Sequence, residues 1–249
     1  MRIAVAGATG LVGSQVTSLA RKEGHEVVEL ARQTGFDLTD PDTGRLEAAL
    51  AGADAVVEVT SFPAIDEATA AEFFTTVATN LGHAATAAGV RRSVVLSIVG
   101  LDDSQDYPYY RAKLAHERAT RAAAPGALVL RATQFHDFPR QLLEWNTDNG
   151  VAQIMDVPTQ PVDTAEIALV LLDMATGAID RDVDLAGPKP ERLVDLARRY
   201  AAHIGSDVTV EPSEAVASMA GGSMLPQGDD VLIRGVNWQT WLEAQPDGR

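Results

Sequence analysis

The chain has 249 residues, a formal net charge of −15, and 46% hydrophobic residues. This length and hydrophobic content allow one large α/β domain with a sizeable core and exclude a disordered chain. The negative charge argues against nucleic acid or an anionic membrane as a partner. Because the sequence has no cysteine, it excludes disulfides, thiolate zinc sites and cysteine nucleophiles.

The chain begins with a pattern that is typical of a dinucleotide-binding turn. Residues 2–6 form an apolar run of strand length, glycines come at positions 7, 10 and 13, and helical spacing of apolar residues starts at Leu11. Glycines in such a turn let the backbone approach a pyrophosphate, and the free N–H groups of the helix start attract its charge. The expected phosphate-binding residues are Gly7, Thr9, Gly10, Leu11, Val12 and Gly13.

Short apolar runs alternate with helical stretches through the first half of the sequence. This alternation predicts an α/β fold with a doubly wound parallel sheet and helices on both faces. Ligands of such sheets bind beyond the carboxyl ends of the strands, where Thr60, Ser61 and Ser97 are expected. Strands are expected at 2–6, 26–30, 55–60, 93–98 and 127–131, and helices at about 43–50, 65–88 and 109–124.

The second half of the sequence is less regular. A capped helix start is expected at Asp163 or Thr164, and residues 192–204 have the pattern of an amphipathic helix. Trp238 and Trp241 share a helical face and are expected to pack in the core or at an interface. We expect a single domain over residues 1–249, in which a small C-terminal lobe, mainly residues 151–157 and 187–249, caps the substrate site.

The residue after the second strand indicates which nicotinamide dinucleotide binds. NAD binders place an acidic residue there, whereas NADP binders place an arginine against the 2′-phosphate. Here Ala31 and Arg32 come after the strand, so NADP(H) is favoured over NAD(H). The alternative is an exposed Arg32, with Glu29 as the acid. Asp37 and Leu38 lie where a contact with adenine is expected, although an aspartate in a turn needs no such role.

A tyrosine and a lysine four residues apart form the second candidate site. On a helix, Tyr109 and Lys113 share one face, and an ammonium beside a phenol lowers the pKa of the tyrosine. We therefore expect Tyr109 to exchange a proton with a carbonyl or alcohol oxygen near neutral pH. Ser97, at the end of the preceding strand, is expected to donate a hydrogen bond to the same oxygen. The alternative is an accidental pair at this spacing.

Taken together, these motifs resemble the short-chain dehydrogenase/reductases, in the extended to atypical branch related to NmrA-like proteins and NAD(P)H-dependent quinone reductases. The resemblance implies a Rossmann-type fold, with Ser97 and Tyr109 on the substrate oxygen and Lys113 also on the nicotinamide ribose. It also places Thr133, Gln134 and Phe135 near the nicotinamide. The matching segments are residues 7–13, 96–100, 131–135, and Tyr109 with Lys113.

One position departs from the family pattern. The further catalytic asparagine has no secure counterpart, because Asn80 lies about one turn too late and is expected to be structural. Atypical relatives that lack the tyrosine only bind or sense the cofactor. The presence of Tyr109 therefore favours catalysis.

The histidines offer one weaker candidate. All five are scattered without the spacing of metal ligands, so no metal site is expected. His136 comes after the turn near the nicotinamide and is a candidate for the substrate pocket. A plain helix start with Asp137 near its N-terminus is the alternative.

The sequence thus predicts a cytoplasmic NADPH-dependent oxidoreductase that reduces a carbonyl-bearing or quinone-like small molecule, with Tyr109 as proton donor. Two alternatives stay open: an NADP-binding redox sensor without turnover, and an epimerase or dehydratase that holds its cofactor tightly. The first residues lack a basic segment before a long apolar one, so no signal peptide or membrane span is expected. We expect a monomer or homodimer.

Overall fold

The structure is a computed structural model that describes residues 1–62, 66–228 and 230–246. The chain folds into two compact units, each assembled from three stretches of sequence. Unit 1 comprises Met1–Ile98, Tyr107–Arg131 and Thr164–Val183, and unit 2 comprises Val99–Asp106, Ala132–Asp163 and Asp184–Arg249. Among the described helices, none is both long enough and apolar enough to cross a membrane.

The main sheet has seven strands in the order β12-β9-β5-β4-β3-β1-β2. The pairs β1–β2, β1–β3, β3–β4 and β9–β12 are parallel, which confirms the expected parallel sheet. The order reverses at β1, whose neighbours are β2 and β3, and parallel sheets bind ligands at the carboxyl ends of strands at such a reversal. The strands are β1 (Arg2–Ala6), β2 (Glu26–Leu30), β3 (Ala55–Glu58), β4 (Arg92–Ile98), β5 (Ala127–Ala132), β9 (Val183–Ala186) and β12 (Val231–Ile233).

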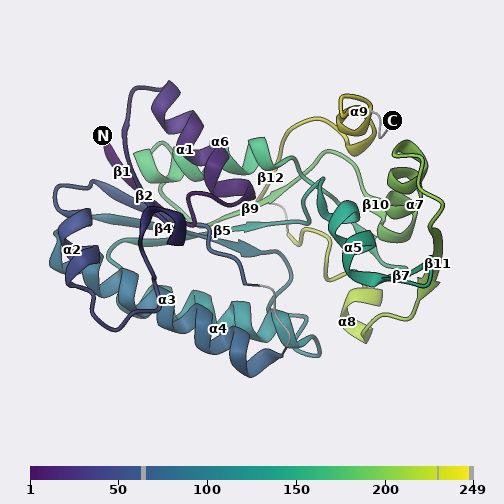
Figure 1. Cartoon of the computed structure of the whole chain (residues 1–249), viewed down its shortest axis with the longest axis horizontal. Helices are drawn as coiled ribbons and strands as arrows, with labels where there is room; N and C mark the ends of the chain where they lie inside the picture. The colour runs from purple at the N-terminus through teal and green to yellow at the C-terminus, as the bar shows by residue number, and fades with distance from the viewer. Residues whose placement is uncertain (63–65, 229, 247–249) are drawn as a thin grey trace. The chain divides into compact units, whose positions relative to one another are not determined.

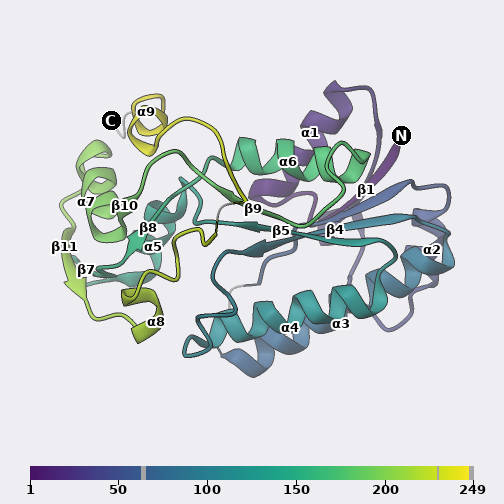
Figure 2. The same cartoon turned by 180° about the vertical axis from the view of Figure 1, so that it is seen from behind.

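Helices cover both faces of the strands of unit 1 (Figures 1 and 2). On one face α1 (Leu11–Lys22) packs against α6 (Thr164–Thr176). On the other face α3 (Glu67–Ala87) packs against both α2 (Gly44–Leu50) and α4 (Pro108–Ala123). The short 3-10 helix η1 (Arg32–Thr34) comes directly after β2. This arrangement confirms the doubly wound fold.

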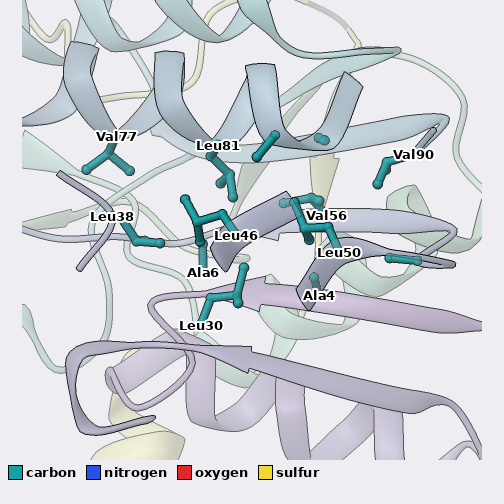
Figure 3. Close-up of a cluster of buried hydrophobic side chains, with 13 residues drawn as sticks. Ala4, Ala6, Leu30, Leu38, Leu46, Leu50, Val56, Val77, Leu81 and Val90 are labelled. Carbon is teal, nitrogen blue, oxygen red and sulfur yellow. The ribbon is translucent and has the colours of Figure 1, made fainter. Parts of the chain in front are cut away.

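A core of aliphatic side chains holds α2 and α3 on the sheet (Figure 3). Ala4 and Ala6 of β1 are fully buried, as is Leu30 of β2, and they lie under Val77 and Leu81 of α3. Strands buried on both faces read as continuous apolar runs, which is why residues 2–6 lack polar alternation. Each fully buried Val or Leu stabilises the fold by about 1.5–3 kcal/mol.

Helix α4, which carries Tyr109 and Lys113, approaches α3 closely at Gly82. A Cβ built at Gly82 would lie 2.7 Å from the carbonyl carbon of Ala123 and 2.8 Å from the nitrogen of Ala124. Real side chains do not tolerate such distances, so glycine at this position sets the spacing between the two helices.

Unit 2 contains helices, short strands and a buried tryptophan. Trp238 is 1% exposed, its Nε1 donates to the carbonyl of His136 at 3.0 Å, and its ring lies 6.2 Å from that of Trp241. Trp238 therefore packs in the core of this unit, as expected, and the half-buried Trp241 packs against it. The elements are α5 (Phe138–Asn146), α7 (Leu193–His203), α8 (Ala217–Ala220), α9 (Trp238–Glu243), a three-stranded sheet of β6 (Thr147–Asp148), β7 (Val151–Met155) and β11 (Thr209–Ser213), and a pair of β8 (Pro158–Thr159) and β10 (Glu191–Arg192).

Element boundaries differ from the expectations by a few residues. The strand expected to reach residue 60 ends at Glu58. The helix expected from Ile65, which lies outside the described residues, begins at Glu67, because the Asp66 side chain accepts from the N–H of Thr69 and caps it. Residues 151–157 and 187–246 belong to unit 2, and their role in capping the substrate site stays a prediction.

Candidate functional site

The glycine turn after β1 is packed so closely that two of its positions have no room for a side chain. A Cβ on Gly13 would lie 2.1 Å from the carbonyl oxygen of Gly7, and one on Gly7 would lie 2.9 Å from that of Val59. Gly7 also has a φ of +84°, which favours glycine. Its N–H donates to the carbonyl of Leu30 at 2.9 Å. The turn is thus fixed between the ends of β2 and β3.

The start of α1 presents free N–H groups to this turn. The first backbone bond of the helix runs from the N–H of Ser14 to the carbonyl of Gly10 at 2.9 Å, so the N–H groups of residues 11–13 precede it. The N-cap residue, Gly10, has no side chain that could accept from these N–H groups, and the first turn carries no acidic residue. The positive end of the helix dipole adds to the attraction of these N–H groups for an anion. The turn therefore fits the pyrophosphate of a dinucleotide.

The segment after β2 lies beside the turn. The hydroxyl of Thr9 donates to the Gln33 side chain at 2.9 Å, a contact that we did not predict, and the neighbouring Arg32 is exposed at the start of η1. The carboxylate of Asp37 accepts from the hydroxyl and the N–H of Thr39, which lower its pKa, and the charge of Arg32 lowers it slightly. Asp37 thus forms a local turn. Its contact with adenine stays a prediction.

Asn80 is a structural residue, as expected. Its Nδ2 donates to the carbonyls of Leu38 at 3.1 Å and Asp40 at 3.0 Å, and so ties α3 to the loop before α2. The side chain of Leu38 is buried in the core of unit 1. The expected contact of Leu38 with adenine would therefore have to be made by its backbone.

The three candidate residues near the ends of β3 and β4 are in different environments. Ser97 is 2% exposed, and its Oγ has no hydrogen-bond partner among the described residues. A buried hydroxyl without a partner costs free energy, so each such group needs an explanation, and a bound ligand would supply one. The hydroxyl of Thr60 donates to Oε1 of Glu58 at 2.9 Å, and Ser61 is exposed.

The ammonium of Lys113 is buried in unit 1. Its Nζ donates to the carbonyl of Leu96 at 3.1 Å, lies 2.7 Å from Nδ1 of His116, and lies 4.6 Å from the ring centroid of Phe74. Burial lowers the pKa of Lys113 to about 8, although the negative charges of Glu58 and Glu117 act in the opposite direction. Lys113 therefore loses its proton more readily than an exposed lysine does.

The sequence did not predict the partners of Lys113. Nε2 of His116 lies 2.7 Å from Oε1 of Glu58, and both residues are buried. Burial lowers the pKa of His116. Burial alone would raise the pKa of Glu58, but the hydrogen bond from His116 and the charge of Lys113 lower it. The available signals were a lone acid within an apolar strand and a histidine three residues after Lys113.

Tyr109 does not have the lowered pKa that was expected. Burial, with a smaller effect of Tyr107, raises the pKa of Tyr109 to about 12. The expectation that Lys113 lowers it is wrong, because desolvation dominates at Tyr109 and the ammonium of Lys113 bonds to Leu96 and His116. Tyr109 packs edge-on against Phe74, with centroids 6.0 Å apart. At neutral pH its phenol is protonated.

The remaining candidates lie in unit 2. The hydroxyl of Thr133 donates to the carbonyl of Gln160 at 2.6 Å, and the side chain of Gln134 accepts from Thr159 at 2.6 Å. These bonds order the loop after β5. The cofactor contacts of Thr133, Gln134 and Phe135 stay predictions.

His136 is fully buried, with Nε2 3.1 Å from the carbonyl of Pro161 and its ring 5.4 Å from that of Trp241. Asp137 is the N-cap residue of α5, which agrees with a plain helix start. A place for His136 in the substrate pocket stays a prediction. In the described parts of the chain, no group of three or more His, Asp or Glu side chains has a geometry that could hold a metal ion.

Comparisons with known proteins agree with the geometry of unit 1. A family model described as NAD(P)H-binding matches residues 7–176. The dTDP-4-dehydrorhamnose reductase of Mycobacterium tuberculosis is 27% identical over 69% of this chain and 66% of its own length. The chain therefore spans just under two thirds of the length of that relative.

Solved structures show the same fold at low identity. The dTDP-4-dehydrorhamnose reductase of Bacillus anthracis in complex with NADP has a TM-score of 0.75 and 13% identity, covering 97% of both chains. MoeE5 in complex with UDP-glucose and NAD has a TM-score of 0.74 and 18% identity, covering 98% of both chains. The glycine turn, the uncapped start of α1 and the match to the family model together show that the chain belongs to the NAD(P)H-binding family, in agreement with its resemblance to short-chain dehydrogenase/reductases.

Proposed function

We propose that the protein is an NAD(P)H-dependent oxidoreductase that reduces a carbonyl group of a small molecule. The observation that carries the proposal is a protonated tyrosine and a buried lysine on α4, in the same unit as the dinucleotide turn. Tyr109, whose pKa is about 12, keeps its proton until an oxygen of higher basicity forms nearby. Such a group suits the reduction of a carbonyl better than the oxidation of an alcohol.

In this proposal, different residues of unit 1 bind the cofactor and act on the substrate. The N–H groups at the start of α1 hold the pyrophosphate, and Lys113 holds the nicotinamide ribose. When bound, the nicotinamide supplies hydride to the carbonyl carbon. The phenol of Tyr109 donates its proton to the carbonyl oxygen, and Ser97, whose Oγ has no partner among the described residues, donates a hydrogen bond to the same oxygen. One hydride and one proton thus convert the carbonyl to an alcohol.

We further propose that NADPH is preferred to NADH. Arg32 is exposed directly after β2, next to the glycine turn, where it is available to the 2′-phosphate. Known structures of this fold have been solved with NADP and with NAD, so the preference rests on Arg32 rather than on the fold.

The names of the relatives suggest where to look for the substrate. The relative from Mycobacterium tuberculosis is a dTDP-4-dehydrorhamnose reductase, which makes keto-sugar nucleotides the first class to test. Quinone-like molecules are the second class. We propose that a single small molecule is the substrate and that the protein is cytoplasmic and acts as a monomer or homodimer.

The test is a panel of keto-sugar nucleotides, simple ketones, aldehydes and quinones, each incubated with the protein and NADPH. We expect one class to cause a loss of nicotinamide absorbance that depends on the protein. If NADPH binds and no carbonyl or quinone is reduced, the sensor becomes the better account. If the panel compound is isomerised or dehydrated without net loss of NADPH, the epimerase or dehydratase replaces the reductase.

A further inference from the structure

A continuous chain of hydrogen bonds runs through the interior of unit 1. It passes from the hydroxyl of Thr60 to Glu58 (2.9 Å), then to His116 (2.7 Å), then to Lys113 (2.7 Å), and ends at the carbonyl of Leu96 (3.1 Å). Glu58, His116 and Lys113 are each less than 5% exposed. The residues come from β3, β4 and α4, so tertiary folding alone brings them together.

We propose that Glu58 and His116 are positioning residues, which hold the ammonium of Lys113 charged and oriented through an imidazole-bridged ion pair. The inference deepens the proposed function, in which that ammonium holds the nicotinamide ribose. Glu58 and His116 contact neither substrate nor cofactor themselves. They act through Lys113.

The groups that meet in these hydrogen bonds determine which atom donates and which accepts. An ammonium has donors and no acceptor, so Nδ1 of His116 must accept from Nζ of Lys113. The imidazole is then neutral, with its proton on Nε2, and donates it to the carboxylate of Glu58. A protonated His116 would place two donors and two positive charges 2.7 Å apart, which is unfavourable. The lowered pKa of His116 agrees with the neutral ring.

Glu58 is the main counter-charge of Lys113. The titratable groups that act on the ammonium are Glu58 from β3 and His116 and Glu117 from α4, and Tyr109 lies one turn earlier on that helix. Helix α3 contributes the ring of Phe74, and β4 contributes a backbone carbonyl. Glu117 forms two hydrogen bonds with Arg131, at 2.8 and 2.9 Å, which offset its charge. Tyr109 is neutral. The carboxylate of Glu58 therefore prevents burial from lowering the pKa of Lys113 further.

A buried ion pair of this kind is poorly explained by stability alone. Desolvation of two charges costs several kcal/mol each, and apolar replacements of such pairs are often neutral or stabilising. The series of hydrogen bonds also begins beside the dinucleotide turn, because Gly7 packs against Val59 and Thr60. The series thus connects the turn with Lys113, the two places in unit 1 that the cofactor is proposed to touch.

The test measures the pKa of Lys113 directly, without substrate or cofactor. The sequence has three lysines, Lys22, Lys113 and Lys189, so a protein labelled with ¹³C-lysine gives three side-chain signals, and K22R and K189R assign them. We expect Lys113 to titrate near pH 8 in the unaltered protein. Glu58→Gln keeps the shape of the side chain and an acceptor for His116. In this variant the pKa of Lys113 should be lower by about one unit or more, which is at least a tenfold change in its protonation equilibrium.

Matched variants separate this effect from the general loss of a charge. Glu67→Gln removes a carboxylate that pairs with Arg111 of α4 and should leave the titration of Lys113 unchanged. His116→Leu breaks the bridge and should act like Glu58→Gln. His116→Gln has an amide that can accept from Lys113 and donate to Glu58. The pKa of Lys113 in this variant should therefore return toward its value in the unaltered protein. If Glu58→Gln does not fold, the titration of Lys113 in the two His116 variants tests the inference instead.

A titration of Lys113 that is the same in Glu58→Gln or His116→Leu as in the unaltered protein overturns the inference, whatever the enzyme assays show. If NADPH turnover is found, its loss at alkaline pH should shift to lower pH in Glu58→Gln, which supports the inference. If no turnover is found but the Lys113 titration shifts as expected, the ion pair stands and the proposed function fails.

Discussion

Burial sets the protonation of both candidate side chains of α4. It raises the pKa of Tyr109 to about 12 and lowers that of Lys113 to about 8, so both lose their protons only above neutral pH. Spacing alone predicted that the two residues share a helix face, and they do. The direction that it predicted for the pKa of Tyr109 was wrong, because that direction depends on which atoms surround the phenol and where the ammonium finds its acceptors.

Replacement of Tyr109 by phenylalanine should reduce turnover by about a hundred- to ten-thousandfold, since a positioned proton donor typically contributes that much. NADPH affinity should change little, because the glycine turn is untouched. Tyr107→Phe is the matched control and should keep most of the turnover, since its hydroxyl has only a minor effect on Tyr109. Full turnover in Tyr109→Phe would exclude the tyrosine as the donor.

Arg32→Ala should remove most of the preference for NADPH. A charge-assisted hydrogen bond to a phosphate is worth about 1.5–3 kcal/mol, which corresponds to roughly ten- to a hundredfold in affinity. Titration of both cofactors, monitored by nicotinamide fluorescence, measures the preference. Equal affinity for NADPH and NADH in the unaltered protein would contradict the assignment.

At the scale of elements, β1, the turn and α1 could be predicted from the sequence because their signals are local. An apolar run predicts the buried strand, glycines predict the turn, and helical spacing of apolar residues predicts the helix. The contacts of the turn were not predictable in detail: the bond from Thr9 to Gln33 joins residues that are 24 apart. The sequence also placed the end of β3 two residues too late, since the β-branched residues Val59 and Thr60 favour a strand but come after strand pairing has ended.

Gly13→Ala should weaken NADPH binding and lower the free energy of unfolding. Its Cβ would lie 2.1 Å from the carbonyl of Gly7, so the turn must move, and overpacking of this kind costs about 1–3 kcal/mol or more. Thermal unfolding and cofactor titration measure the two effects. Gly44→Ala, at the start of α2, is the control and should be neutral or slightly stabilising. Unchanged affinity in Gly13→Ala would show that the turn does not hold the cofactor.

At the scale of the whole molecule, the sequence predicted the parallel sheet but not the division of the chain into two compact units. Unit 1 is assembled from three separate stretches and unit 2 from three others. Strand and helix signals are local, whereas this division depends on which stretches contact one another. The hydrogen bond between Glu58 and His116 was missed for the same reason, since 58 residues separate its partners.

The central claim is that the protein transfers hydride from a nicotinamide cofactor to a carbonyl. NADPH that carries deuterium at the hydride-donating position tests it, with the substrate found in the panel and mass spectrometry of the product. We predict one deuterium on the carbinol carbon of the product for each NADPH consumed. In Tyr109→Phe the amount of this product should fall by the same factor as the turnover. A product without deuterium, or deuterium that stays on the cofactor while the substrate is converted, would contradict the account.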